Sequence, residues 1–190
     1  MGRTVYWMNV SIDLRIEGVS GEDGGGEWLR IGEPLHLEFN RRARELALMI
    51  QGRTVYEIME AYWPAAADDS SLPAYLREYG RIWTEKPKVL VSNSRTEAAN
   101  DTRVVGGPDA LEQLAQIRAE TDGAIGVGGA TLATQMLRRG LLDELLLFIH
   151  PTILGAGRPL FDDLEEPLGC ELVEQATFEH GVVMHRYAIT

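Results

Sequence analysis

The stretch GAIGVGGATLATQML, residues 123–137, gives the strongest indication of the fold of this chain. A short apolar run that contains Gly126, Gly128 and Gly129 leads directly into a segment whose apolar residues recur at helical spacing. Gly126 is interpreted as a packing glycine inside a strand, and Gly128 and Gly129 as points where a ligand approaches the backbone. The stretch therefore predicts a strand, a tight turn and a helix, the repeating unit of α/β proteins.

Similar units are predicted on both sides of this stretch. Residues 4–13 alternate as a strand does, with Tyr6 and Val10 on one face and Trp7 and Asn9 on the other. A glycine-rich, acidic loop over 17–34 is interpreted as a mobile or functional segment such as a lid. A helix over 35–47 and a strand ending at Gly52 follow.

Further elements complete the pattern. We expect a helix with Thr54 as its N-cap and its end at Pro64, a strand over 89–91, and a helix begun by a capping box of Asp109 and Glu112. A long apolar strand and two strands joined near His180 end the chain. The prediction is a single α/β domain over 1–190, with a mostly parallel sheet and an antiparallel C-terminal hairpin.

Composition limits the classes of partner. The formal net charge of -11, from 18 Lys and Arg against 29 Asp and Glu, argues against nucleic acid, whose affinity depends on clustered basic residues. The single cysteine, Cys170, excludes an intramolecular disulfide and is interpreted as a small packing residue in a reduced compartment. The N-terminus lacks the apolar run of a signal peptide, and no segment approaches the roughly 20 apolar residues of a membrane span, so we expect a cytoplasmic protein.

Three predicted strands end in residues suited to phosphate groups: Gly52-Arg53-Thr54, Ser92 to Arg95, and Gly128-Gly129-Ala130-Thr131. Helix N-termini, hydroxyl groups and forked guanidinium groups are the usual partners of a pyrophosphate and a ribose phosphate. Together these ends predict a nucleotide site. The glycine stretch does not match the dinucleotide fingerprint, since Thr131 stands where its third glycine belongs. The four histidines lack metal-ligand spacing, so no metal site is expected.

The order of these elements resembles the dihydrofolate-reductase-like fold, and within it the reductase domain of the riboflavin-biosynthesis enzyme. The resemblance covers almost the whole chain and is most specific in GVGGATLATQMLRRGLLDELLLFIHPTILGAGRPLF. It implies a three-layer α/β fold, a homodimer and an NADPH-dependent reductase with 5-amino-6-(5-phosphoribosylamino)uracil reductase activity, acting on a small polar heterocycle with or without a phosphate group.

The resemblance also assigns residues to the cofactor. Gly52, Arg53 and Thr54 would contact the phosphates, with Arg53 at the 2'-phosphate, and Ser92 and Arg95 would flank the adenosine. Gly128, Gly129, Ala130 and Thr131 would hold the pyrophosphate at a helix N-terminus. The nicotinamide side would be formed by Met8, Asn9 and Ile16.

The substrate side of the expected site consists of Ser11, Trp28 and Tyr56, with Asp13, Glu33 or water as the source of a proton. Glu33 follows Trp28 by five residues, as an acid does in dihydrofolate reductases. The chain departs from the family where Leu14 and Arg15 follow Asp13. This departure leaves an alternative open, a protein that keeps the cleft but binds a nucleotide, pterin, flavin or antifolate without catalysis.

Overall fold

The computed structural model describes residues 1–19 and 26–190, so the predicted lid over 17–34 lies partly outside the described residues. The strands are β1 (Arg3–Ser11), β2 (Arg15–Glu17), β3 (Leu46–Gly52), β4 (Lys88–Val91), β5 (Thr102–Val105), β6 (Ala124–Gly128), β7 (Glu144–His150), β8 (Arg158–Pro159), β9 (Cys170–Thr177) and β10 (Val183–Ile189). The helices are α1 (Glu33–Glu45), α2 (Arg53–Asp68), α3 (Ala74–Glu85), α4 (Ala110–Glu120), α5 (Ala130–Arg138) and a 3-10 turn, η1 (Glu179–Gly181).

One large sheet organises the described part of the chain. Its 8 strands lie in the order β5-β4-β3-β6-β1-β7-β10-β9. All pairs from β5 to β7 are parallel, whereas β10 runs antiparallel to both β7 and β9. The structure therefore confirms the predicted α/β class, with a mostly parallel sheet and an antiparallel C-terminal hairpin.

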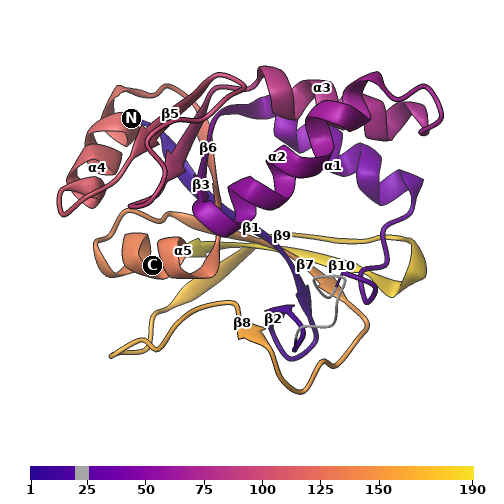
Figure 1. The fold of residues 1–190 in the computed structure, drawn as a ribbon. Helices are drawn as coiled ribbons and strands as arrows, with labels where there is room; N and C mark the ends of the chain where they lie inside the picture. Colours follow the sequence, from indigo (N-terminus) through magenta and orange to yellow (C-terminus); the bar gives the residue numbers. More distant parts are fainter. Residues whose placement is uncertain (20–25) are drawn as a thin grey trace.

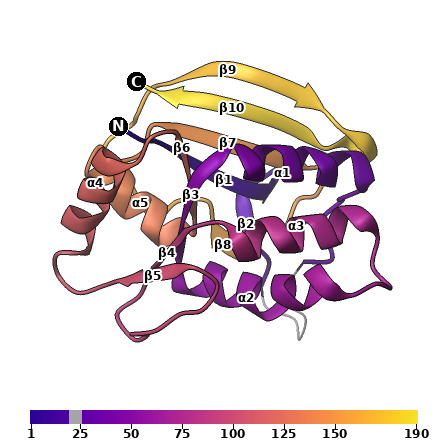
Figure 2. The ribbon, with the colours of Figure 1, turned by 90° about the horizontal axis from the view of Figure 1, so that it is seen from above.

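Helices cover both faces of this sheet and make three layers (Figures 1 and 2). Helices α1, α2 and α3 lie on one face, and α4 and α5 lie on the other. Alternate residues of β1 enter the two cores, since Tyr6 packs with the α4 and α5 side and Val5 with the α1 and α3 side. The predicted strand periodicity of this segment is thus confirmed, and it reflects a strand that is covered on both faces.

Helix α2 continues through Pro64 to Asp68, so the predicted end at Pro64 is wrong. Ala66 and Ala67 beyond the proline are buried. They face α3 where it contains Gly80, at which a Cβ atom would lie only 2.7 Å from the backbone nitrogen of Ala67. Close packing of α2 on α3, together with the high helix propensity of alanine, offsets the hydrogen bond that the proline removes.

The predicted N-cap of α2 is wrong, and the predicted N-cap of α4 is in place without its capping hydrogen bond. Thr54 is the second residue of α2, and Gly52 occupies the N-cap position. Asp109 is the N-cap of α4, but its side chain makes no capping hydrogen bond with the described residues, so the predicted capping box with Glu112 does not form. Helix α2 begins directly after β3 ends at Gly52, so the end of the strand decides its first residue.

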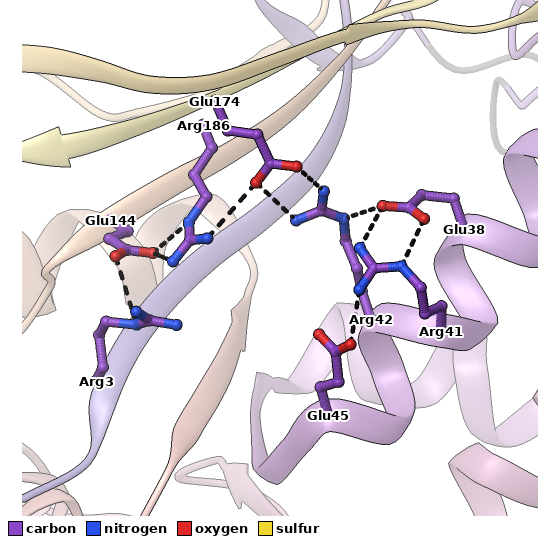
Figure 3. Close-up of polar contacts among 8 residues, drawn as sticks. All are labelled: Arg3, Glu38, Arg41, Arg42, Glu45, Glu144, Glu174 and Arg186. Carbon is purple, nitrogen blue, oxygen red and sulfur yellow. Dashed lines mark hydrogen bonds and ion pairs between the residues drawn. The ribbon is translucent and has the colours of Figure 1, made fainter.

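A chain of ion pairs fixes α1 against the strands at the hairpin end of the sheet (Figure 3). Arg42 of α1 contacts Glu38 at 2.6 Å on its own helix and Glu174 of β9 at 2.5 Å. Glu174 also contacts Arg186 of β10, which pairs with Glu144 of β7 at 2.7 Å. Arg42 is buried, so its pairs lie in a less screened environment than the other arginine pairs of this helix.

The far edge of the sheet is formed by β9, whose first four residues are exposed. Cys170 is one of them, so its interpretation as a packing residue is wrong. Leu172 and Val173 follow it and are about half exposed, at 45% and 50%. In the described residues, no helix has both the length and the apolar character needed to cross a bilayer.

Candidate active site

A cavity of about 480 Å³ lies where α1 and α2 cover the carboxyl ends of β1, β3 and β6. Ligands of open α/β sheets bind at this edge, beyond the carboxyl ends of the strands. The described residues that line it are Trp7, Met8, Asn9, Ile16, Gly26, Trp28, Leu29, Ile31, His36, Phe39, Leu46, Met49, Gln51, Val55, Ile58, Met59, Tyr62, Trp63, Tyr79, Gly126, Val127 and Gly128.

Glycines of β6 form the floor of this cavity. Gly126 pairs in register with Met49 of β3, and Gly128 pairs with Gln51. Because side chains alternate between the faces of a strand, both glycines lie on the face that α1 and α2 cover. A side chain at either position would fill the space that the cavity occupies.

Packing also requires these two glycines. A Cβ atom on Gly126 would lie 2.7 Å from Cδ1 of Leu46, which supports its interpretation as a packing glycine. A Cβ atom on Gly128 would lie 3.2 Å from Cγ1 of Val55, in the first turn of α2. Leu46 and Val55 both line the cavity, so side chains at these two positions of β6 would push against its wall.

The N-termini of α2 and α5 meet beside the cavity. Their N-caps are Gly52 and Gly129, and no side chain of the described residues caps either helix. A Cβ atom built on Gly129 would be 3.7 Å from Cα of Gly52, so the two turns are in contact. Two adjacent helix N-termini present free backbone N–H groups and positive dipole ends, the arrangement that binds phosphate groups.

Gly129 also has a conformational reason to be glycine, because its φ of 109° is a value that other residues rarely adopt. Ala130 is buried as the first residue of α5, and Thr131 is exposed next to it. The Thr131 hydroxyl accepts a hydrogen bond of 2.6 Å from Arg158 of β8. Arg158 therefore adds a guanidinium group at this helix end, one that the sequence did not single out.

Arg53 and Thr54, both predicted to contact phosphates, are exposed at the start of α2. Among the described residues, the Arg53 guanidinium contacts only Glu57, at 3.3 Å and one turn further along the helix. An exposed pair of this kind is weak and leaves the guanidinium able to exchange partners.

Ser92 and Arg95 lie beyond β4, on the other side of β3 from the glycine floor. The Ser92 hydroxyl accepts hydrogen bonds from the backbone N–H groups of Ser94 and Arg95, and so holds this turn together. Arg95 pairs with Glu60 of α2 at 2.7 Å and lies over the ring of Tyr56. The structure therefore gives both residues local structural partners, in the turn at the adenosine end of the expected site.

Residues expected to face the nicotinamide do line the cavity: Met8, Asn9 and Ile16. The pairing of β1 with β6 ends at Tyr6, whereas its pairing with β7 continues to Ser11. The carboxyl half of β1 therefore separates from β6, and Asn9 lies where the sheet opens.

His150 orients Asn9. The Nδ1 atom of His150 accepts the backbone N–H of Arg30, so its proton is on Nε2, which donates to Oδ1 of Asn9 at 3.0 Å. Trp28, which was expected on the substrate side, packs edge-on against the same imidazole and lines the cavity. Burial, and then the charge of Arg30, lower the pKa of His150 to about 4, so the ring is neutral at physiological pH.

Asp13 does not have the environment of a proton donor, which corrects the expectation from the sequence. Its carboxylate accepts hydrogen bonds from the backbone N–H groups of Leu154 and Gly155 and from the hydroxyl of Ser11. The Leu154 bond is the largest of the effects that lower the pKa of Asp13 to about 2. Asp13 and Ser11 therefore hold the turn after β1, and neither is among the residues that line the cavity.

Glu33 and Tyr56 are likewise outside the lining of the cavity, contrary to expectation. Glu33 is exposed as the first residue of α1, because that helix begins directly after the loop. Tyr56 is fully buried, and its hydroxyl is 3.1 Å from the carbonyl oxygen of Ala99, next to Thr102 of β5. It packs on Trp83 of α3, away from the cavity.

Two polar residues that the sequence did not single out do line the cavity. Gln51, the residue before Gly52 in β3, is buried, and its Oε1 has no hydrogen-bond partner among the described residues. His36 of α1 is buried among the aromatic rings of Phe39, Trp63 and Tyr79. No local motif marks either residue, since only the fold brings α1 over the end of β3.

The eight-stranded sheet, the covering helices and a cleft at its carboxyl edge define this chain as a dihydrofolate-reductase-like α/β protein. Solved structures agree on the fold. A putative riboflavin biosynthesis protein from Shewanella sp. PV-4 superposes with a TM-score of 0.76 at 19% identity, over 99% of each chain. Dihydrofolate reductase from Enterococcus faecalis, complexed with NADP(H), superposes with a TM-score of 0.62 at 15% identity, over 100% of this chain and 97% of that one.

The chain belongs to the RibD C-terminal domain family, whose sequence model matches residues 5–184. Among its relatives is the uncharacterized protein YyaP of Bacillus subtilis strain 168, 29% identical over 186 residues, which are 97% of this chain and 94% of that protein. The family includes reductases, and reductases of this fold typically bind a nicotinamide cofactor. The resemblance inferred from the sequence is thereby confirmed.

Proposed function

We propose that this protein is an NADPH-dependent reductase that transfers hydride to a small unsaturated ring. The observation that carries the proposal is the contact between Gly52 and Gly129, which brings two uncapped helix N-termini together beside an aromatic cavity. Paired N–H groups next to a cavity suit a dinucleotide, whose phosphates need donors and whose nicotinamide needs a dry, apolar pocket.

The residues present fit this cofactor. Gly52, Thr54, Gly129, Ala130 and Thr131 would provide backbone and hydroxyl donors for the pyrophosphate. Arg53 would contact the 2'-phosphate, and Arg158 is a second cation at the α5 terminus. Ser92 and Arg95 would flank the adenosine, and Gly128, Met8, Asn9 and Ile16 would border the nicotinamide.

When bound, the reduced nicotinamide supplies the hydride, and the residues of the chain orient the reactants and exclude water. Asn9, held by His150, would fix the position of the carboxamide. Asp13 and Glu33 do not line the cavity, so we assign proton delivery to water that enters through its mouth.

The test is nucleotide binding to purified protein. We expect NADPH to bind more tightly than NADH, and Arg53→Ala to weaken NADPH binding about tenfold or more while NADH binding is unchanged, because the lost contact is a charge-assisted hydrogen bond to the 2'-phosphate. Arg81→Ala, an exposed arginine on α3, is the matched control. Failure of both nucleotides to bind would exclude this function.

A second candidate function is binding without turnover, of a nucleotide, pterin, flavin or antifolate. It is favoured by one observation: no carboxylate is found among the described residues that line the cavity. Tight NADPH binding without oxidation in the presence of a panel of pyrimidine, pterin and nitro compounds would favour it.

The remaining parts of the proposal follow from family membership and from charge. We propose a cytoplasmic homodimer that binds a small-molecule substrate, with neither nucleic acid nor membrane as a partner. The formal net charge of -11 supports the exclusion of nucleic acid.

A further inference from the structure

Large aromatic side chains form part of the wall of the cavity. Six of the described lining residues have aromatic rings, and they come from β1, α1, α2, α3 and the segment before α1: Trp7, Trp28, Phe39, Tyr62, Trp63 and Tyr79. Aromatic side chains present flat apolar faces and bind other flat rings by stacking or edge contacts. The shape and chemistry of the walls therefore suit a planar ring.

Charged side chains are not part of this lining. Among the described residues around the cavity there is no Asp, Glu, Lys or Arg. The sequence of residues 20–25, SGEDGG, contains no basic residue either. An anionic group inside the cavity would lose its hydration without contact to a cationic lining residue, which is costly.

Two polar residues of the lining, Gln51 and His36, have acceptor atoms without a donor among the described residues. Gln51 is 6% exposed, and its Oε1 has no partner among the described residues. A buried carbonyl oxygen of this kind is costly unless a ligand donates to it.

His36 provides the second acceptor. The Nδ2 group of Asn40 donates to the carbonyl oxygen of Tyr75 and to Glu78, so Oδ1 of Asn40 must accept the hydrogen of His36 Nδ1. Nε2 of His36 then has a lone pair. Burial lowers the pKa of His36, so this ring stays neutral and offers no positive charge to an anion.

We propose that the cavity binds an uncharged planar ring that carries N–H or O–H donors, and that it discriminates against rings carrying a carboxylate or phosphate group. Stacking on the aromatic walls provides the affinity. Gln51 and His36 accept hydrogen bonds from the donors of the ring. The inference rests on the proposed function, because the ring is the hydride acceptor and shares the cleft with the cofactor.

This substrate class differs from the phosphoribosyl pyrimidine that the family resemblance implied. A phosphate group needs cations or paired N–H donors, and these lie at the N-termini of α2 and α5, where the cofactor is proposed to bind. Near the mouth of the cavity the exposed lining residues are uncharged, among them Ile31, Ile58 and Tyr62.

The test compares two probes of equal size, 2-naphthamide and 2-naphthoate, by isothermal titration calorimetry at pH 7. The amide is neutral and carries N–H donors, whereas the carboxylate is anionic and has none. Titrations use protein saturated with NADPH, whose reduced ring is uncharged. We expect the amide to bind at least tenfold more tightly than the carboxylate.

Two substitutions localise the effect. Gln51→Leu removes the acceptor and should weaken naphthamide binding about 2- to 10-fold, the range for one neutral hydrogen bond. Ile58→Arg adds a cation at a position that is 65% exposed, so the fold should tolerate it. It should strengthen naphthoate binding, and Ile58→Gln, which adds a polar group without charge, should not.

The outcomes separate this inference from the proposed function. If NADPH does not bind, the proposed function is wrong, and titrations without nucleotide still decide the ligand class. If naphthoate binds as tightly as naphthamide, or if neither probe binds, the inferred class is overturned whatever the result with NADPH.

Discussion

Nε2 of His150 lies 3.0 Å from Oδ1 of Asn9, and this hydrogen bond joins the end of β7 to β1 at the edge of the cavity. The imidazole also accepts the backbone N–H of Arg30 and packs against Trp28. One buried neutral histidine thereby positions the segment before α1, a cavity-lining indole and the Asn9 amide. Its protonation would break this arrangement.

The first prediction concerns pH. The pKa of His150 is lowered to about 4 in the folded protein, below the 6.5 of an unperturbed histidine. The unfolded chain therefore binds more protons between these values, and stability should fall as the pH drops from 6.5 towards 4. After a discount for solvent screening, the loss should be on the order of 2 kcal/mol. The lowered pKa of His36 acts in the same direction.

Urea denaturation of the wild type and of His150→Gln at several pH values between 4.5 and 7 measures this effect. Glutamine keeps a donor for Asn9 but does not titrate, so the pH dependence should be clearly reduced in the variant. Identical pH dependence in the two proteins would contradict the assignment to His150.

The second prediction concerns the ion pairs that hold α1 to the sheet (Figure 3). Arg42→Met should lower the free energy of unfolding by about 1–3 kcal/mol, because it leaves Glu38 and Glu174 without their partly buried partner. Arg41→Met is the matched control on the same helix. The Arg41 side chain is 50% exposed, so its loss should cost about 0.5 kcal/mol. Equal losses from both substitutions would argue against a special role for Arg42.

The third prediction concerns the floor of the cavity. Gly126→Ala would place a methyl group 2.7 Å from Cδ1 of Leu46, a side chain that lines the cavity, so its displacement should change the shape of the cavity. We expect a stability loss of about 1 kcal/mol and at least a threefold weaker binding of 2-naphthamide. The double substitution Gly126→Ala with Leu46→Val should restore part of the affinity, which calorimetry can measure. Additive effects in this cycle would show that the two residues are not coupled.

The elements that could be predicted are those with strong local patterns. The apolar alternation of β1 and the glycine-to-helix transition at residues 123–137 predicted the α/β class and the carboxyl edge that holds the cavity. Helix α3 was not predicted, although Tyr75, Tyr79 and Trp83 recur at helical spacing within it. Its interior Gly80 weakens the local signal, and close packing on α2 compensates for that weakness.

The position of the cavity could be predicted only from the strands and turns that border it. Gly128, Met8 and Asn9 line the cavity, and their contacts with a cofactor stay predictions. Gln51, His36 and Arg158 were missed, because the sequence places them on separate elements and nothing local links them. Asp13 was assigned to chemistry because a carboxylate after a strand is a common catalytic pattern, whereas here three hydrogen bonds hold it in a turn.

The fourth prediction concerns the homodimer that the family resemblance implies. The edge strand β9 exposes Leu172 and Val173, and an exposed strand edge is suited to pairing with a second copy. Light scattering after size-exclusion chromatography should give a dimer for the wild type and a monomer for Val173→Lys. Gln175→Lys, on the same strand, is the polar control and should remain dimeric. A monomeric wild type would show that the predicted dimer is wrong.

Trp7, Trp28 and Trp63 line the cavity, and Trp83 is the only other tryptophan of the chain. Three of the four tryptophans would therefore lie beside a ligand in the cavity. Indole emission overlaps the absorption of reduced nicotinamides, so energy transfer would make the occupancy of the cleft visible without any label. The energy-transfer signal should disappear as the nicotinamide is oxidised. Tryptophan fluorescence should therefore follow a single turnover.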